Sequence, residues 1–189
     1  MMSSGAILDQ TAAELGLIKL RDSDDFIPTL RQVLQLVAGK VPLLIEIKEQ
    51  LDTMQDTSGR LESAVATALA DYDGPVAVMS FNPHCMAHMA RLAPQIARGL
   101  TTEDYDPEDC APIPPDVCAR LRAIPDFDRT GASFISHKAS DLARPRVGEL
   151  KSKGATVLCW TIRSVAQETM ARQIADNITF EGYPAAVGA

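Results

Sequence analysis

Short apolar segments alternate with amphipathic helical segments along this 189-residue sequence, and this alternation constrains the fold more than any other feature. Most of the apolar segments are rich in β-branched or aromatic residues and are flanked by turn residues, as strands usually are. We predict strands at residues 43–47, 76–81, 96–100, 133–136, 155–162 and 177–182. A strand followed by a helix and then by another strand predicts a parallel α/β sheet, in which functional residues gather at the carboxyl ends of the strands.

The predicted helices have recognisable ends. Thr29 and Gln32 form a capping-box pattern, residues 164–167 form a second, and Asn82 followed by proline is typical of a helix start. Further helices are predicted near residues 61–69, 115–124 and 142–153.

Residues 101–131 interrupt the alternation with a long loop whose first half, TTEDYDPEDCAPIPPD, is acidic and rich in proline. A loop of this length is usually functional or mobile. We expect its acidic side chains to form a solvated surface run, the alternative being a lid that borders a site. These side chains belong to Glu103, Asp104, Asp106, Glu108 and Asp109.

Charge and hydropathy exclude several classes of protein. The net charge is −7 and no basic stripe is visible, which argues against a nucleic-acid partner. No apolar run approaches the ~18 residues of a transmembrane helix, and the first residues lack the pattern of a signal peptide. We therefore expect a cytoplasmic protein without membrane insertion.

The four cysteines are Cys85, Cys110, Cys118 and Cys159. None belongs to a C-x-x-C pair, so their spacing favours neither a structural zinc site nor a disulfide. Cys159 lies in an apolar segment and is predicted to be a small core residue.

Two charged residues lie in the first predicted strand, in the stretch LLIEIKEQ. Side chains alternate along a strand, so Glu46 and Lys48 share one face while Ile45 and Ile47 share the other. A carboxylate at a strand end is a good ligand for a hard cation, and the lysine can neutralise an anion bound to that cation. Composition supports equally an internal ion pair between Glu46 and Lys48 without any ligand.

Polar, charged and aromatic residues also end the later strands. They are Ser80, Phe81, Asn82, Ser136, His137, Lys138, Trp160, Thr161, Arg163 and Glu181. Cations, carboxylates, a histidine and an indole that converge on one face would suit a phosphate ester bound with a metal.

The histidines differ in their prospects. His137 is a candidate general acid or base, although the sequence identifies no group to position it. His84 and His88 would share one helix face, but the glutamate of H-E-x-x-H and a third ligand are missing. We interpret that pair as surface or partly packed helix residues.

Five segments of the chain resemble the glycerophosphodiester phosphodiesterase family. They are FIPTLRQVL (26–34), LLIEIK (43–48), VMSFNP (78–83), GATVLCWTIR (154–163) and DNITFEGY (176–183). The resemblance implies a TIM barrel that acts in lipid metabolism, hydrolysing glycerophosphodiesters to an alcohol and glycerol 3-phosphate with a divalent cation, Mg²⁺ or Ca²⁺. It makes Glu46 a metal ligand, places Lys48 near the phosphate, and has Trp160 and Phe81 line the substrate pocket.

Several family motifs have no counterpart in this sequence. The family opens with His-Arg-Gly, Glu-x-Asp and His-Asp motifs, which carry its catalytic histidines and its other metal ligands, and later it more often has Thr-Asp where this chain has Phe180-Glu181. The chain is also shorter than the ~200-residue lower bound of a TIM barrel. We expect one N-terminally truncated domain over residues 1–189, an incomplete (β/α)8 barrel with about six of the eight strands.

Three functional hypotheses follow. The first is a phosphodiesterase that binds its cation weakly, so that this chain alone is impaired or inactive. The second is a non-catalytic relic or interaction module of the same fold, and the third is an unrelated phosphate-binding α/β domain. In an open barrel, exposed strand edges would favour a homo-oligomer.

Overall fold

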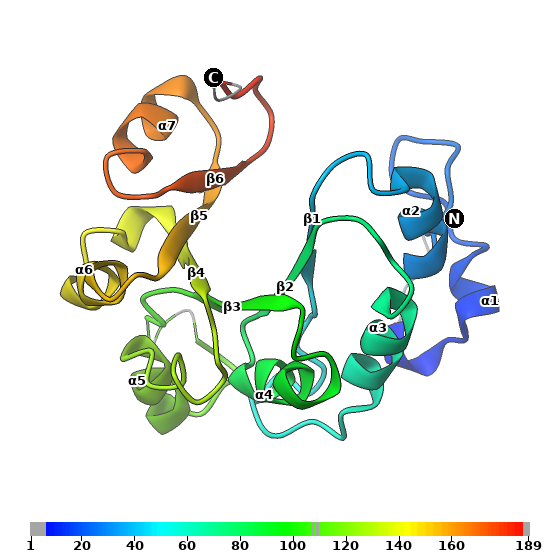
Figure 1. Cartoon of the computed structure of the whole chain (residues 1–189), viewed down its shortest axis with the longest axis horizontal. Coiled ribbons are helices and arrows are strands. Elements are labelled where there is room, and N and C mark those ends of the chain that lie inside the picture. The colour runs from blue at the N-terminus through cyan, green and yellow to red at the C-terminus, as the bar shows by residue number, and fades with distance from the viewer. Residues whose placement is uncertain (1–6, 107, 109, 187–189) are drawn as a thin grey trace.

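Residues 7–106, 108 and 110–186 are described by the computed structural model of the chain. Its sheet contains six parallel strands, each paired with the next along the chain. The strands are β1 (Leu43–Glu46), β2 (Val76–Ser80), β3 (Ala97–Thr102), β4 (Phe134–Lys138), β5 (Thr156–Ile162) and β6 (Asn177–Phe180). Figure 1 shows a half-barrel that is open between β1 and β6. All six predicted strands and the incomplete (β/α)8 fold are confirmed.

Helices precede the first strand and lie between consecutive strands. They are η1 (Ile7–Asp9), α1 (Ala12–Leu15), α2 (Leu30–Val37), α3 (Arg60–Leu69), α4 (Pro83–Leu92), α5 (Pro115–Arg122), η2 (Ala139–Asp141), α6 (Pro145–Ser152) and α7 (Val165–Ala171). The predicted capping box is present at Thr29 and Gln32. The second is only half formed, because Ser164 accepts a hydrogen bond from the Gln167 amide while the Gln167 side chain accepts from the Arg163 amide instead.

The two faces of the sheet have different surroundings. Side chains that point outward from the barrel pack beneath the helices, and Val78, Ile135 and Val157 are fully buried there. The next residues along the strands point inward. Together with residues just before and after the strands, they line an open cavity of about 560 Å³. Leu44 of β1 and Leu158 of β5 are among its lining residues. The main core therefore lies outside the half-barrel, between the sheet and its helices.

Gly99 shows how closely the inner face is packed within the sheet. It pairs in register with Phe134 of β4. A Cβ atom at residue 99 would lie 2.3 Å from the Phe134 ring, so only glycine leaves room for that ring.

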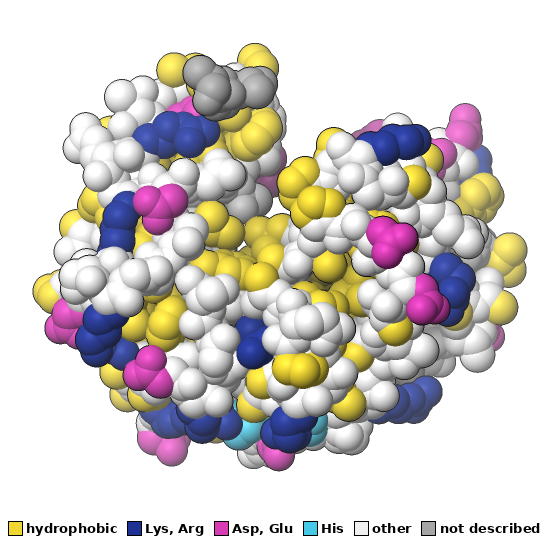
Figure 2. Space-filling model, viewed as in Figure 1, with side chains coloured by type: hydrophobic (Ala, Val, Ile, Leu, Met, Phe, Trp, Pro, Cys, Tyr) yellow, Lys and Arg dark blue, Asp and Glu magenta, His cyan; other side chains and the backbone are white. Residues whose placement is uncertain are grey.

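Large apolar side chains remain exposed near both ends of the sheet. Before β1, Leu17 and Leu36 are each more than three-quarters exposed, and Val165 and Met170 of α7 are also mostly exposed. Figure 2 shows hydrophobic side chains along the notch between the two ends of the half-barrel. Exposed apolar surface of this kind marks an interaction site or an aggregation liability. Among the described residues, no helix has both the length and the apolar character needed to cross a membrane.

The expectation that the cysteines form no disulfide is wrong for one pair. Cys110 and Cys118 are disulfide-bonded, with their Cα atoms 6.6 Å apart. The chain turns back after Cys110 to enter α5, which brings Cys118 next to it, and eight-residue spacing alone does not reveal such a turn. Cys85 and Cys159 are free and buried, so the predicted core position of Cys159 is confirmed.

Candidate functional site

An aromatic pair spans the mouth of the half-barrel at the carboxyl ends of the strands. Phe81 follows β2 and Trp160 lies in β5, yet their ring centroids are only 5.4 Å apart in an edge-to-face arrangement. Three strand spacings along a flat sheet would separate them by roughly 14 Å. The contact therefore requires a curved sheet with both rings on its concave side, and the Trp160 indole also donates a hydrogen bond to the Ser136 carbonyl.

Glu46 and Lys48 form an ion pair at the end of β1. The Lys48 ammonium lies 2.8 Å from a Glu46 carboxylate oxygen, and the Lys48 side chain is 78% exposed while that of Glu46 is 22% exposed. Glu46 has the same alternation as Leu44, which lines the inner cavity, whereas Ile47 is buried in the core. The two faces predicted from the sequence are thus confirmed, and Glu46 and Lys48 are paired with each other at the surface.

Lys138 is one of the strand-end cations identified from the sequence, and the structure shows which groups it contacts. It lies at the end of β4, in register with Trp160. Its ammonium contacts the Asp104 carboxylate at 2.8 Å and the Glu103 carboxylate at 3.8 Å. The hydrogen bond from Lys138 lowers the pKa of the Asp104 carboxyl below its ordinary value. Strand alternation with Phe134, which lines the inner cavity, places Lys138 on the inner face of β4.

The acidic run therefore divides into two parts. Glu103 and Asp104 are half-buried and paired with Lys138, so a solvated run is wrong for them. Asp106 and Glu108 are exposed, as predicted. Asp109 lies outside the described residues.

His137 faces the opposite side of β4 from Lys138. It is fully buried, with one ring nitrogen 2.8 Å from the Thr102 hydroxyl and the other 3.1 Å from the Asp141 carboxylate. Burial lowers the pKa of its imidazole, against a smaller opposing effect of Asp141. The positioning partners that the sequence could not identify are thus Thr102 and Asp141, and they hold a neutral imidazole away from the mouth.

Arg163 and Glu181 lie beyond the ends of the last two strands. They form an ion pair at 2.7 Å in which both side chains are more than half exposed. Arg163, Lys138 and Trp160 also line an open cavity of about 640 Å³ between η2 and α7. This cavity lies beside the carboxyl ends of β4 and β5.

His84 and His88 are partly packed residues of α4, as interpreted from the sequence. Both approach the Asp56 carboxylate, at 3.7 and 3.0 Å. Arg91 donates a hydrogen bond to the second ring nitrogen of His88. Within the described part of the chain, no group of three or more histidine, cysteine or acidic side chains could hold a metal ion.

A half-barrel of parallel strands with cationic and aromatic side chains at its carboxyl mouth defines the class of protein: an α/β domain of the (β/α)8 type. The chain belongs to the glycerophosphoryl diester phosphodiesterase family, whose model matches residues 5–179. The resemblance read from the sequence is confirmed, and the third hypothesis, an unrelated domain, is wrong. Curated proteins include no match to this chain.

Solved structures share the fold. A putative glycerophosphodiester phosphodiesterase from Galdieria sulphuraria superposes with a TM-score of 0.71 at 19% identity, over 94% of this chain and 68% of the other. A putative glycerophosphoryl diester phosphodiesterase from Agrobacterium tumefaciens gives 0.71 at 19% identity, over 93% and 69%. A phosphodiesterase from Oleispira antarctica, in complex with its product sn-glycerol-3-phosphate, gives 0.66 at 20% identity, over 93% and 68%.

Proposed function

We propose that the chain forms one glycerophosphodiester phosphodiesterase-like domain whose mouth binds the glycerophosphate part of a glycerophosphodiester. The observation that carries this proposal is the contact between Phe81 and Trp160 across a mouth that also contains lysines. The family match supports the reaction class, and the related structure from Oleispira antarctica contains sn-glycerol-3-phosphate.

Each mouth residue has a role in this proposal. Lys48, which is mostly exposed, neutralises charge on the phosphate. The charge of Lys138 is already compensated by Asp104 and Glu103, so in this proposal Lys138 holds that acidic segment at the mouth. The Trp160 and Phe81 rings provide apolar surface for the glycerol carbons, and the bond from Trp160 to Ser136 fixes the indole. These residues bind and orient a phosphodiester.

The divalent cation of such a reaction fits the residues of this chain poorly. Family resemblance makes Glu46 a ligand of a divalent cation. Ca²⁺ takes roughly six to eight oxygen ligands, and Mg²⁺ is octahedral and usually bound through one or two carboxylates together with waters and substrate phosphates. Glu46 is the one carboxylate proposed for this role, and it is paired with Lys48. A tightly held cation does not fit this donor set, so we infer that metal-dependent hydrolysis by this chain alone is impaired or absent.

A non-catalytic relic or interaction module of the same fold is the second candidate. The open inner cavity and the exposed apolar side chains near both ends of the sheet favour it. Strand edges at β1 and β6 would then pair with a second copy of the chain. Sedimentation velocity at several concentrations tests this: a concentration-dependent dimer supports pairing, and a monomer at every concentration contradicts it.

Binding of sn-glycerol 3-phosphate is the direct test of the mouth. Trp160 is the single tryptophan of the sequence, so its fluorescence reports on the site. We expect a saturable change in fluorescence that Lys48→Ala weakens. Lys153→Ala should keep it, because Lys153 is an exposed lysine at the C-terminal end of α6. Equal titration curves for the two variants would refute the phosphate role of Lys48.

Hydrolysis is assayed separately on glycerophosphodiesters with added Mg²⁺ or Ca²⁺. We expect little or no turnover by this chain. If turnover is found, Glu46→Ala should abolish it, and equal activity in both proteins would refute the assignment of Glu46. Binding without turnover would support both the proposed binding site at the mouth and the proposed impairment of hydrolysis.

A further inference from the structure

The disulfide lies at the centre of a small apolar cluster that is separate from the main core. Its buried members are Tyr105, Cys110, Cys118 and Leu121, with Met54, Phe81, Ile113 and Val117 packed against them. Phe81 therefore has two neighbours of different kinds: this cluster on one side and Trp160 on the other. A continuous path of packed side chains joins the disulfide to the aromatic pair of the mouth.

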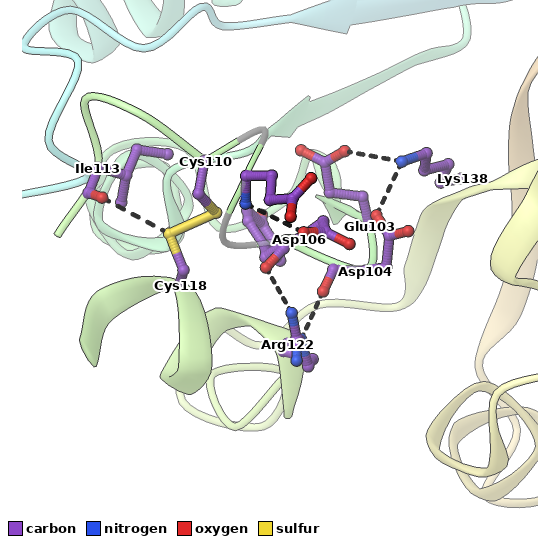
Figure 3. Close-up of a disulfide and its surroundings, with 10 residues drawn as sticks. Glu103, Asp104, Asp106, Cys110, Ile113, Cys118, Arg122 and Lys138 are labelled. Atoms are coloured by element: carbon purple, nitrogen blue, oxygen red, sulfur yellow. Dashed lines mark hydrogen bonds and ion pairs between the residues drawn. A yellow bond between two sulfur atoms is a disulfide. The ribbon is translucent and has the colours of Figure 1, made fainter. Parts of the chain in front are cut away.

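The segment before Cys110 is held by α5 as well. The Arg122 guanidinium donates to the carbonyl oxygens of Asp104 and Tyr105, at 2.5 and 2.6 Å. Figure 3 shows this arrangement, with the disulfide on one side of the loop and the contacts of Lys138 to Glu103 and Asp104 on the other. The bond and Arg122 thus fasten the two ends of one segment to the same helix.

We propose that the Cys110–Cys118 disulfide is a positioning element for the mouth. It holds the small apolar cluster together and so keeps Phe81 in contact with Trp160. Neither cysteine is a residue of the proposed binding site, and the bond acts through Phe81. The inference uses the mouth residues of the proposed function, but it concerns their placement and requires neither binding nor hydrolysis.

The sulfur atoms can be separated by a dithiol reductant. A reductant thiolate attacks one sulfur and forms a mixed disulfide, and the other cysteine leaves as a thiolate that takes up a proton. The second reductant thiol then displaces the first cysteine, so the protein gains two electrons and two protons while the reductant becomes a cyclic disulfide. Cys110, at 7% exposed, is the more accessible of the two residues, compared with 1% for Cys118.

Reduction of the disulfide should increase the solvent exposure of the Trp160 indole without unfolding the chain. The main core contains neither Cys110 nor Cys118, so the sheet and its helices are expected to stay intact. Phe81 would lose packing contacts on the side of the cluster. Water and small quenchers would then reach the Trp160 indole more often. In a reducing compartment the mouth would therefore be looser than in an oxidising one.

The experiment measures acrylamide quenching of Trp160 with and without dithiothreitol, with far-UV circular dichroism recorded in parallel. Alkylation and mass spectrometry first establish which cysteines are bonded. We expect reduction to raise the quenching constant and shift the emission to longer wavelength, with unchanged dichroism. The double variant Cys110→Ser/Cys118→Ser should show the reduced signature in both conditions, and Cys85→Ala, which leaves the bond intact, should respond like the parent chain.

Phe81→Leu separates positioning from a merely structural role. The change removes the ring that links the cluster to Trp160, so reduction should no longer alter quenching in this variant. An equal response in Phe81→Leu, no response in the parent chain, loss of dichroism on reduction, or free Cys110 and Cys118 thiols before reduction would each overturn the proposal. A failure to bind sn-glycerol 3-phosphate would contradict only the proposed function.

Discussion

The two faces of β4 contrast a surface buried in the core with a surface proposed to bind ligand. Ile135 and His137 point outward and are fully buried beneath the helices. Phe134 lines the inner cavity, and Lys138, on the same face, reaches the mouth, where it contacts two carboxylates. Neighbours one residue apart thus have opposite environments. A change on the outer face should cost folding free energy, and one on the inner face should alter binding more than folding.

The largest expected effect is on the outer face. Ile135→Ala should destabilise the chain by about 2–5 kcal/mol, because it leaves a cavity in a well-packed core. Leu44→Ala removes a side chain of the same size from the inner face, where Leu44 is 39% exposed, and should cost less than half as much. Urea unfolding of the two variants measures the difference. Equal losses would show that the inner face is covered in solution, for example by a second copy.

A smaller effect concerns the buried imidazole of His137. Burial lowers its folded pKa below the unfolded value, so the unfolded chain binds the proton first as the pH falls. Its contribution is complete above about pH 6.5 and is lost as the pH falls from there through the lowered folded pKa. His137→Gln should flatten this part of the stability curve, whereas His84→Gln should leave it in place. Denaturation midpoints between pH 7 and pH 4.5 provide the comparison.

Lys138→Ala removes the ion pair with Asp104 at the mouth and should lower the free energy of unfolding only modestly. Its partners are partly exposed, so the loss at neutral pH should be about 1 kcal/mol or less. The folded pKa of Asp104 is lowered, so the pair stabilises the fold above the unfolded pKa of about 3.8, and that stability is lost as the pH falls through the folded pKa. Parent and variant should therefore converge in acid. A difference that persists at pH 2 would mean that Lys138 acts by packing instead.

The smallest effect on stability is expected for Lys48→Ala. The pair with Glu46 lies at the surface, and pairs of this kind contribute about 0–1 kcal/mol. Its free energy of unfolding should stay within about 0.5 kcal/mol of the parent value, while affinity for sn-glycerol 3-phosphate falls. A large loss of stability without any loss of affinity would reverse the assignment of this face to binding.

Local patterns in the sequence predicted much of this structure. Apolar segments and turn residues located all six strands, and the Thr29 and Asn82 caps located two helix starts. Alternation within LLIEIK placed Glu46 and Ile47 on opposite faces. These features depend on residues within a few positions of one another, where backbone geometry fixes direction, so no knowledge of distant contacts is needed.

Contacts between distant residues were decided only by the tertiary structure. Curvature of the sheet brings Phe81 to Trp160, and a turn before α5 brings Cys110 to Cys118. The pairing of Asp104 with Lys138 joins residues 34 positions apart, and it turned part of a supposed surface run into part of the mouth. The sequence by itself determined the order of elements and the direction of their side chains. Which of those side chains meet depended on sheet curvature and loop path, because both arise from packing of the whole chain.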